Sequence, residues 1–224
     1  MAYFVDRVDA GKRLASAMTD VKGRNAVVLA IPRGGVVVGY QIAIALRLPL
    51  DVIIAHKIGA PGNPELAIGA VAEDGSIFLD SKLAAYTGAD ESFIQQESED
   101  QKTEIQRRLK TYRQNQALSL LGKEVIIVDD GIATGATVKA ALVSAKNRGA
   151  KTVTIAVPVG PPSTIEELKK QGADRVVCLY TPEWFQAIGQ FYSNFDQTSD
   201  EEIITLLKQS RQRSGGKQSE AVRV

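Results

Sequence analysis

Short apolar runs rich in Val and Ile recur along the chain and alternate with longer segments whose apolar residues follow a helical spacing. The runs are typical of strands in a sheet that is buried on both faces, and the spaced residues are typical of helices. Strands are predicted at residues 26–31, 51–55, 77–79, 124–128, 152–157 and 175–180. Helices are predicted at residues 7–19, 36–46, 136–148 and 164–171.

The alternation of strands and helices predicts an α/β fold, with a Rossmann-like parallel sheet flanked by helices. One domain is expected to span residues 1–210, followed by a flexible tail at 211–224, which lacks apolar periodicity. Residues 90–116 have the polarity of an exposed helix. Their few apolar residues predict a thin packing stripe, with a subunit contact or a lid as the alternative: Phe93, Ile105, Leu109 and Tyr112.

The most informative segment is residues 125–137, VIIVDDGIATGAT, in which an apolar strand runs into two acids and a loop of Gly, Ala and Thr. Asp129 and Asp130 follow the strand at its carboxyl end, where ligands bind in open α/β sheets. Gly131 and Gly135 let the backbone aim several N–H groups at one anion, and a helix begins directly afterwards. The pattern predicts a phosphate-binding loop beside two carboxylates that can hold sugar hydroxyls or a hard cation. The alternative is an ordinary turn with a solvated acid pair, although neighbouring carboxylates repel each other.

A second turn from strand to helix, Pro32-Arg33-Gly34-Gly35, is expected on the same edge of the sheet. Gly34 and Gly35 allow the backbone to approach an anion closely, and Arg33 can neutralise its charge. Alone, this segment could equally be a plain turn with an exposed arginine. Together, the two loops indicate a sugar that carries phosphate at one end and diphosphate at the other.

These residues resemble the type I phosphoribosyltransferases. DDGIATGAT is similar to the motif that binds phosphoribosyl diphosphate (PRPP) in that family, and PRGG is similar to its pyrophosphate loop. The resemblance implies the family's fold, with a small hood formed mainly by residues 180–198 and the N-terminal segment. It also implies a Mg²⁺-dependent glycosyltransferase that uses PRPP as donor to a nitrogenous acceptor such as a nucleobase. A homodimer is implied as well.

The resemblance assigns roles to individual residues. Asp129 and Asp130 would contact the ribose hydroxyls and hold Mg²⁺ through water, since Mg²⁺ keeps much of its hydration shell. Arg33, Gly34 and Gly35 would bind the diphosphate, and Lys57 would supply charge to the leaving pyrophosphate. Lys57 begins the segment 57–64, KIGAPGNP, which is similar to the family's mobile loop; a rigid surface turn is the alternative. The 5-phosphate would be held by the loop after the acids: Gly131, Ala133, Thr134, Gly135, Ala136 and Thr137.

Two features concern the acceptor. Hypoxanthine-guanine members of the family carry an aspartate at the position of Ala133, whereas adenine and uracil types carry Ala, so a 6-oxopurine is the less expected substrate. Five aromatic residues lie between positions 184 and 195. Trp184 and Phe185 are candidate acceptor-binding residues within this group, because an aromatic ring can stack on a base. The alternative is that the group belongs to the core.

Composition excludes several function classes. A net charge of +1 offers no basic field for nucleic acid. Cys178 and His56 are the only residues of their types, so one chain cannot form a disulfide or a His/Cys zinc site. We expect Cys178 to be a small buried side chain and His56 a partly buried one. With no membrane-length apolar run, a soluble cytoplasmic protein is expected. A serine hydrolase is disfavoured because G-x-S-x-G is absent, and a non-catalytic PRPP-binding regulator remains as the alternative.

Overall fold

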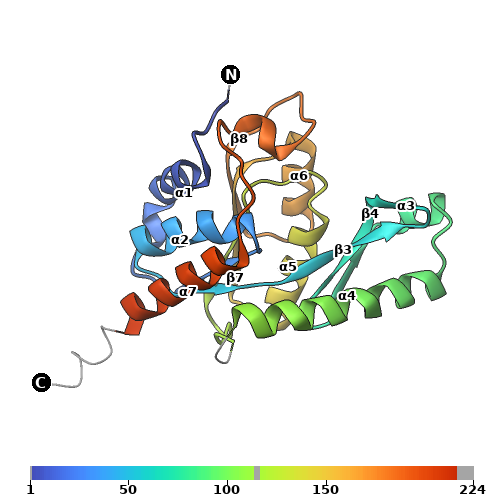
Figure 1. Ribbon diagram of the computed structural model, residues 1–224, viewed down its shortest axis with the longest axis horizontal. Coiled ribbons are helices and arrows are strands. Elements are labelled where there is room, and N and C mark those ends of the chain that lie inside the picture. The colour runs from blue at the N-terminus through green and yellow to red at the C-terminus, as the bar shows by residue number, and fades with distance from the viewer. Residues whose placement is uncertain (1, 114–116, 216–224) are drawn as a thin grey trace, which may run out of the picture.

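The structure is a computed structural model that describes residues 2–113 and 117–215 (Figure 1). Its centre is a five-stranded parallel sheet with strand order β2-β1-β6-β7-β8. The α/β fold with a parallel sheet, as predicted from the sequence, is confirmed. The strands of this sheet are β1 (Ala26–Ala30), β2 (Leu50–Val52), β6 (Glu124–Val128), β7 (Thr152–Val159) and β8 (Arg175–Tyr180).

Helices cover both faces of the parallel sheet, which explains why β1 is apolar at every position (Figure 1). Successive side chains of a strand point to opposite faces. Val28 therefore packs in the core beneath α1 (Arg7–Ser16), α2 (Gly34–Leu46) and α7 (Asp200–Gly215). Its neighbour Val27 packs in the opposite core, beneath α5 (Ala136–Asn147) and α6 (Pro162–Lys170).

A second, antiparallel sheet forms the small hood of the fold and projects from the side of the parallel sheet (Figure 1). It consists of β3 (Ala55–Ala60), β4 (Asn63–Ala72) and β5 (Ile77–Leu79). The prediction of a loop at 57–64 is wrong in this respect, because most of that segment lies in β3 and β4 and only a tight turn separates them. The strand predicted at 51–55 is likewise split, since β2 ends at Val52 and β3 begins at Ala55.

Two helices support the antiparallel sheet on one side. They are α3 (Ser81–Tyr86) and the long α4 (Glu91–Tyr112). The packing stripe predicted for α4 is confirmed: Phe93 packs against the sheet, Leu109 packs against the core under α7, and Ile105 and Tyr112 are fully buried there.

The segments after β8 follow the sequence predictions only in part. Residues 180–198, expected with the N-terminal segment to supply most of the hood, pack against that segment: the backbone N–H groups of Tyr3 and Phe4 both donate to Phe191 O at 2.9 Å. Helix α7 is absent from the sequence predictions, and it continues to Gly215, past the expected start of the tail at Arg211. Residues 216–224 of that tail lie outside the described residues. Within the described ranges, no helix is both long and apolar enough to span a membrane.

Candidate functional site

The acid pair and the PRGG loop meet at the carboxyl edge of the parallel sheet. The N–H of Ile31, at the end of β1, donates to Val128 O at the end of β6 with a distance of 2.8 Å. A methyl group at Gly35 would lie 2.8 Å from that carbonyl oxygen and 3.0 Å from Asp129 Cα. Only glycine allows the PRGG loop to approach the acids this closely. The structure therefore brings together the two loops that the sequence predicts as neighbours.

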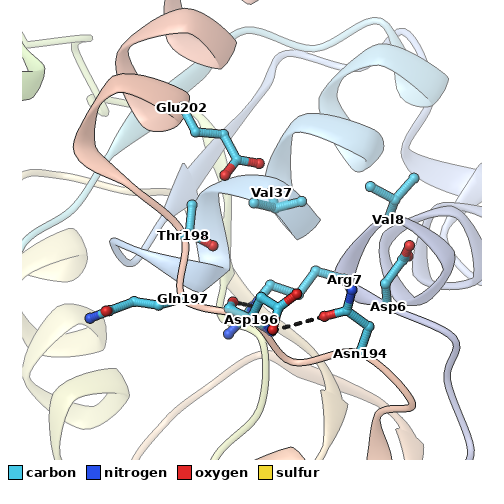
Figure 2. A pocket seen from close by; sticks show the side chains of 9 residues that line it. All are labelled: Asp6, Arg7, Val8, Val37, Asn194, Asp196, Gln197, Thr198 and Glu202. Carbon is cyan, nitrogen blue, oxygen red and sulfur yellow. Dashed lines mark hydrogen bonds between the residues drawn. The ribbon is translucent and has the colours of Figure 1, made fainter.

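Asp130 is held by two residues that belong to neither loop. Its Oδ2 accepts a hydrogen bond from Arg7 Nε at 2.7 Å, and both side chains are 12% exposed. Its backbone carbonyl accepts from the hydroxyl of the buried Tyr192 at 2.6 Å. The Arg7 guanidinium lies 3.9 Å from the centre of the Phe195 ring, and Nη1 donates to Asp196 O at 2.7 Å (Figure 2). The N-terminal helix and the segment before α7 are thus fixed to the acid pair.

The electrostatics of the acid pair favour a bound cation. Removal from water raises the pKa of Asp129 well above its ordinary value, and the charge of Asp130 raises it further. Burial also raises the pKa of Asp130, but Arg7 opposes that shift. Among the described residues, no arginine makes an ion pair with Asp129, although the charge of Arg7 partly opposes the rise in its pKa. Its Oδ1 accepts a hydrogen bond from the Asp130 N–H at 2.8 Å. A cation or hydroxyl groups placed at Asp129 would relieve this unfavourable charge.

The loop between Gly131 and Ala136 has the form of an anion cradle. Gly135 precedes α5 with φ of +72°, in the left-handed region that favours glycine. The hydroxyl of Thr164, on α6, donates a hydrogen bond to Ala133 O at 2.7 Å, which fixes the loop to that helix. Ala133 and Thr134 themselves are exposed, and the first turn of α5 contains no acid. A helix start without an acid of its own favours an anion there.

The two predicted cations occupy different positions. Arg33 is half-buried and follows a cis Pro32–Arg33 peptide. Its backbone carbonyl accepts from the Val36 N–H at 3.1 Å, whereas its side chain makes no hydrogen bond or ion pair with another described residue. Lys57 lies on β3, where its Nζ is 2.8 Å from Glu65 Oε2. Strand alternation puts Lys57 on the same sheet face as Ala55, which packs against the start of α5 at Ala136. Lys57 is therefore already paired with an acid, whereas the Arg33 side chain has no such partner among the described residues.

The aromatic group near residue 190 is mainly core. Phe191 and Tyr192 are buried with Phe4, and the rings of Phe185 and Phe191 lie 5.4 Å apart. Trp184 differs because 88% of it is exposed to solvent. Of the two candidate acceptor residues, Phe185 is therefore a packing residue in this structure, and Trp184 is a free aromatic surface.

The single histidine and cysteine lie in structural positions; His56 is partly buried as expected, whereas Cys178, expected to be buried, is only half-buried. His56 pairs through Nδ1 with Gln101 Oε1 at 3.0 Å on α4, and burial lowers the pKa of His56. The Cys178 thiol lies 3.2 Å from Tyr180 O, and burial raises its pKa to about 11. Such a thiol stays protonated at neutral pH and is not activated as a nucleophile.

Arg7, Tyr192 and Thr164 are the site residues that the sequence does not reveal. Arg7 stands 123 positions before Asp130, in a stretch typical of an ordinary first helical turn. In the sequence, Tyr192 is only one aromatic residue among five. No local pattern indicates these long-range contacts, although an arginine within an otherwise amphipathic first turn is a weak signal.

Tyr192→Phe is expected to lower the free energy of unfolding by about 1–3 kcal/mol, because the buried Asp130 carbonyl would lose its hydrogen bond. Burial raises the pKa of Tyr192, so its hydroxyl is a proton donor at neutral pH. Urea unfolding monitored by fluorescence measures the change. Tyr86→Phe is the control, since Tyr86 is 88% exposed and its change should stay within about 0.5 kcal/mol. Equal values for the two variants would contradict a supporting role for Tyr192.

Comparisons with known proteins agree with this geometry. The model of the phosphoribosyl transferase domain family matches residues 6–196. Rv0571c and MT0597, from two strains of Mycobacterium tuberculosis, are each 44% identical to this chain over 208 residues and are provisionally named phosphoribosyl transferases. The matches cover 92% of this chain and 47% of each relative, so the chain spans about half the length of the curated relatives it matches.

A solved structure gives the same result for the fold. The crystal structure of TT1426 from Thermus thermophilus is 40% identical in sequence, with a TM-score of 0.78, and the match covers 93% of this chain and 99% of that one. The family match includes both glycine loops, the acid pair and Arg7. The chain therefore belongs to the phosphoribosyl transferase domain family, as its two loops predicted.

Proposed function

We propose that the protein is a Mg²⁺-dependent phosphoribosyltransferase that uses PRPP as the donor to a nitrogenous acceptor. One observation carries the proposal: two glycine loops suited to anions converge on a mostly buried acid pair at a single edge of the sheet. A ligand that fits all three parts carries an anion at each end and hydroxyl groups between them. PRPP has this arrangement.

Each end of the donor has a matching part of the site. The ribose hydroxyls would bind Asp129 and Asp130, and the 5-phosphate would bind the backbone and side chains of residues 131–137. The diphosphate would lie on Gly34 and Gly35, with Arg33 and Lys57 as cations. Arg33 supports this assignment because its side chain makes no hydrogen bond or ion pair with another described residue, so its guanidinium can bind an anion.

The acid pair also fits a magnesium ion. Mg²⁺ is usually held by one or two carboxylates together with water and substrate phosphates, rather than by a complete cage of protein ligands. Asp129 and Asp130 provide two carboxylates, and in the described parts of the chain no group of three or more His, Cys, Asp or Glu could hold a metal. Bound with the donor, the ion would supply positive charge to the diphosphate oxygens.

The protein's contribution to the reaction is orientation and electrostatic stabilisation. The bond between ribose C1 and the diphosphate oxygen breaks, its electrons leave with pyrophosphate, and a bond forms between C1 and the acceptor nitrogen, which loses a proton. Donors and cations on the PRGG loop would stabilise the developing charge on the leaving pyrophosphate. The acids would fix the sugar so that C1 faces the acceptor.

The class of acceptor base is inferred mainly from one residue, Ala133. Ala133 is exposed at the loop and carries no group that exchanges a proton, so the loop offers no base to a 6-oxopurine. Adenine or uracil is therefore the better candidate, with Trp184 as an exposed aromatic surface on which a base can stack. The homodimer implied by the family resemblance and the cytoplasmic location inferred from composition remain predictions.

The proposal is tested by offering PRPP and Mg²⁺ with a panel of purine and pyrimidine bases and measuring pyrophosphate release. We expect turnover with at least one base, and faster turnover with adenine or uracil than with hypoxanthine or guanine. A preference for hypoxanthine or guanine would overturn the use of Ala133. Saturable PRPP binding without turnover on any base would favour a non-catalytic PRPP-binding regulator, and absence of PRPP binding would refute both.

A further inference from the structure

Arg7 lies where the acid pair and the PRGG loop meet, although it belongs to neither. A methyl group at Gly34 would lie 2.7 Å from Arg7 Nε and would clash with the Asp130 carboxylate. The guanidinium is therefore directly against the backbone that is proposed to bind the diphosphate. Helix α1 is capped by Asp6, whose carboxylate accepts from the Asp9 N–H at 2.8 Å, so the backbone beside Arg7 is well fixed.

The guanidinium has hydrogen-bonding capacity that the protein does not use. An arginine carries five N–H donors in a rigid planar fork. Nε donates to Asp130 and Nη1 donates to Asp196 O, whereas Nη2 makes no hydrogen bond with any described residue. Nε and Nη2 form one edge of the fork, so the unused donors face the same side as Asp130. Such an edge can bridge a carboxylate and a phosphate oxygen.

The surroundings hold this side chain in place. Its face stacks on Phe195 at 3.9 Å, and its side chain is 12% exposed. Figure 2 shows it reaching toward Asp196, along one wall of a pocket of about 180 Å³ that is lined also by Thr198 and Glu202. An arginine fixed in advance loses little conformational entropy when it binds an anion.

We infer that Arg7 binds the diphosphate end of the donor through Nη2 while Nε holds Asp130, so that one residue connects the leaving group with the ribose-binding acids. The inference rests on the proposed function, because it takes PRPP as the donor. It adds to that function a diphosphate-binding residue that lies outside both loops. It also links donor binding to the segment 194–198 through the hydrogen bond to Asp196 O.

The test compares two ligands that share ribose and 5-phosphate and differ in the diphosphate. Binding of PRPP and of ribose 5-phosphate, both with Mg²⁺, is measured by calorimetry for wild type, Arg7→Lys and Arg7→Gln. Arg7→Gln is expected to weaken PRPP binding by about tenfold or more, and ribose 5-phosphate binding by less than about threefold. Arg7→Lys keeps the cation without the fork, so its loss for PRPP should be smaller. Binding of inorganic pyrophosphate should weaken in each variant by about as much as binding of PRPP does.

Arg13→Gln is the matched control. Arg13 lies on the same helix, pairs with Asp9 at 2.9 Å and lies near two aromatic rings, but its side chain makes no hydrogen bond or ion pair with a described residue of either loop. The Arg13→Gln variant should bind PRPP and ribose 5-phosphate with the affinities of the wild type. If the Arg7 variants bound PRPP and ribose 5-phosphate more weakly by the same factor, Arg7 would act only by placing Asp130. If they bound PRPP as tightly as the wild type, Arg7 would have no role in donor binding. Either result would overturn the inference. Wild-type protein that does not bind PRPP would instead refute the proposed function. Thermal unfolding confirms that each variant is folded.

Discussion

Asp129→Asn is expected to lower PRPP-dependent pyrophosphate release by at least about tenfold, while the protein becomes no less stable. The activity should fall because a hydroxyl group or a cation binds a carboxylate more tightly than a neutral amide. The loss should appear in the affinity for PRPP and Mg²⁺ as well as in turnover. Asparagine keeps an oxygen that can accept the hydrogen bond from the Asp130 N–H, so the loop itself need not change.

The stability prediction follows from the raised pKa of Asp129. Burial and the charge of Asp130 raise that pKa above its ordinary value of 3.8. A carboxyl group with a raised pKa contributes stability below its unfolded pKa, and the contribution is lost as the pH rises through the folded pKa. At neutral pH the Asp129 carboxylate therefore destabilises the donor-free protein. The unfolding free energy of Asp129→Asn relative to wild type should increase from about pH 4 upward.

Asp130→Asn provides the contrast from the adjacent position. It leaves a mostly buried guanidinium without its carboxylate, so it should be less stable than Asp129→Asn. Because burial also raises the pKa of Asp130, the loss should be smaller than the value of about 3–5 kcal/mol typical of a broken buried pair. Urea unfolding at several pH values, together with the pyrophosphate assay, measures both variants. Wild-type turnover in Asp129→Asn would contradict its place at the ribose. A stability loss as large as that of Asp130→Asn would contradict the account of its pKa.

The strands of the parallel sheet could be predicted because their local sequence alone identifies them. The predicted strands at 124–128 and 175–180 match the structure to the residue, and the first strand is predicted only one residue too long, at Ile31. A strand buried on both faces is apolar throughout, so its limits coincide with a change in composition. The acid pair and the glycines were equally predictable, because they follow these strands directly.

Of the antiparallel sheet, only β5 was predicted, at 77–79, and the sheet itself was not. Strand β4, NPELAIGAVA, contains Pro, Gly and several Ala, none of which favours strands. It forms because β3 and β5 pair with it on both sides and because its small residues allow close packing, as Ala70 does against Ala140 of α5. Arg7 was missed for a related reason, since its role depends on contacts across 123 positions. Strand pairing and contacts between distant residues depend on the tertiary structure, so a local sequence pattern does not predict them.

A buried network of ion pairs joins the parallel sheet to the antiparallel sheet. Glu73, after β4, accepts from Arg148 at 2.7 Å and from Arg113 at 3.2 Å, and its side chain is only 6% exposed. Arg113 also pairs with Asp51 at 3.3 Å, next to β1 in the parallel sheet. The Ile54 N–H donates to Glu73 at 3.2 Å, at the chain segment between β2 and β3. One carboxylate thus fixes the direction in which the hood leaves the parallel sheet.

Glu73→Gln is expected to lower the free energy of unfolding by about 3–5 kcal/mol, because two mostly buried arginines would lose the charge that they share. The substitution preserves shape, so denaturant unfolding measures the loss of charge. Glu99→Gln is the control: Glu99 pairs with Lys102 at 2.6 Å, but its side chain is 59% exposed, and its change should not exceed about 1 kcal/mol. If both variants lost the same amount, the network would be no more than a set of surface pairs. A large loss at Glu73 alone would show that the stability of the protein depends on a buried carboxylate between the two sheets, remote from the proposed chemistry.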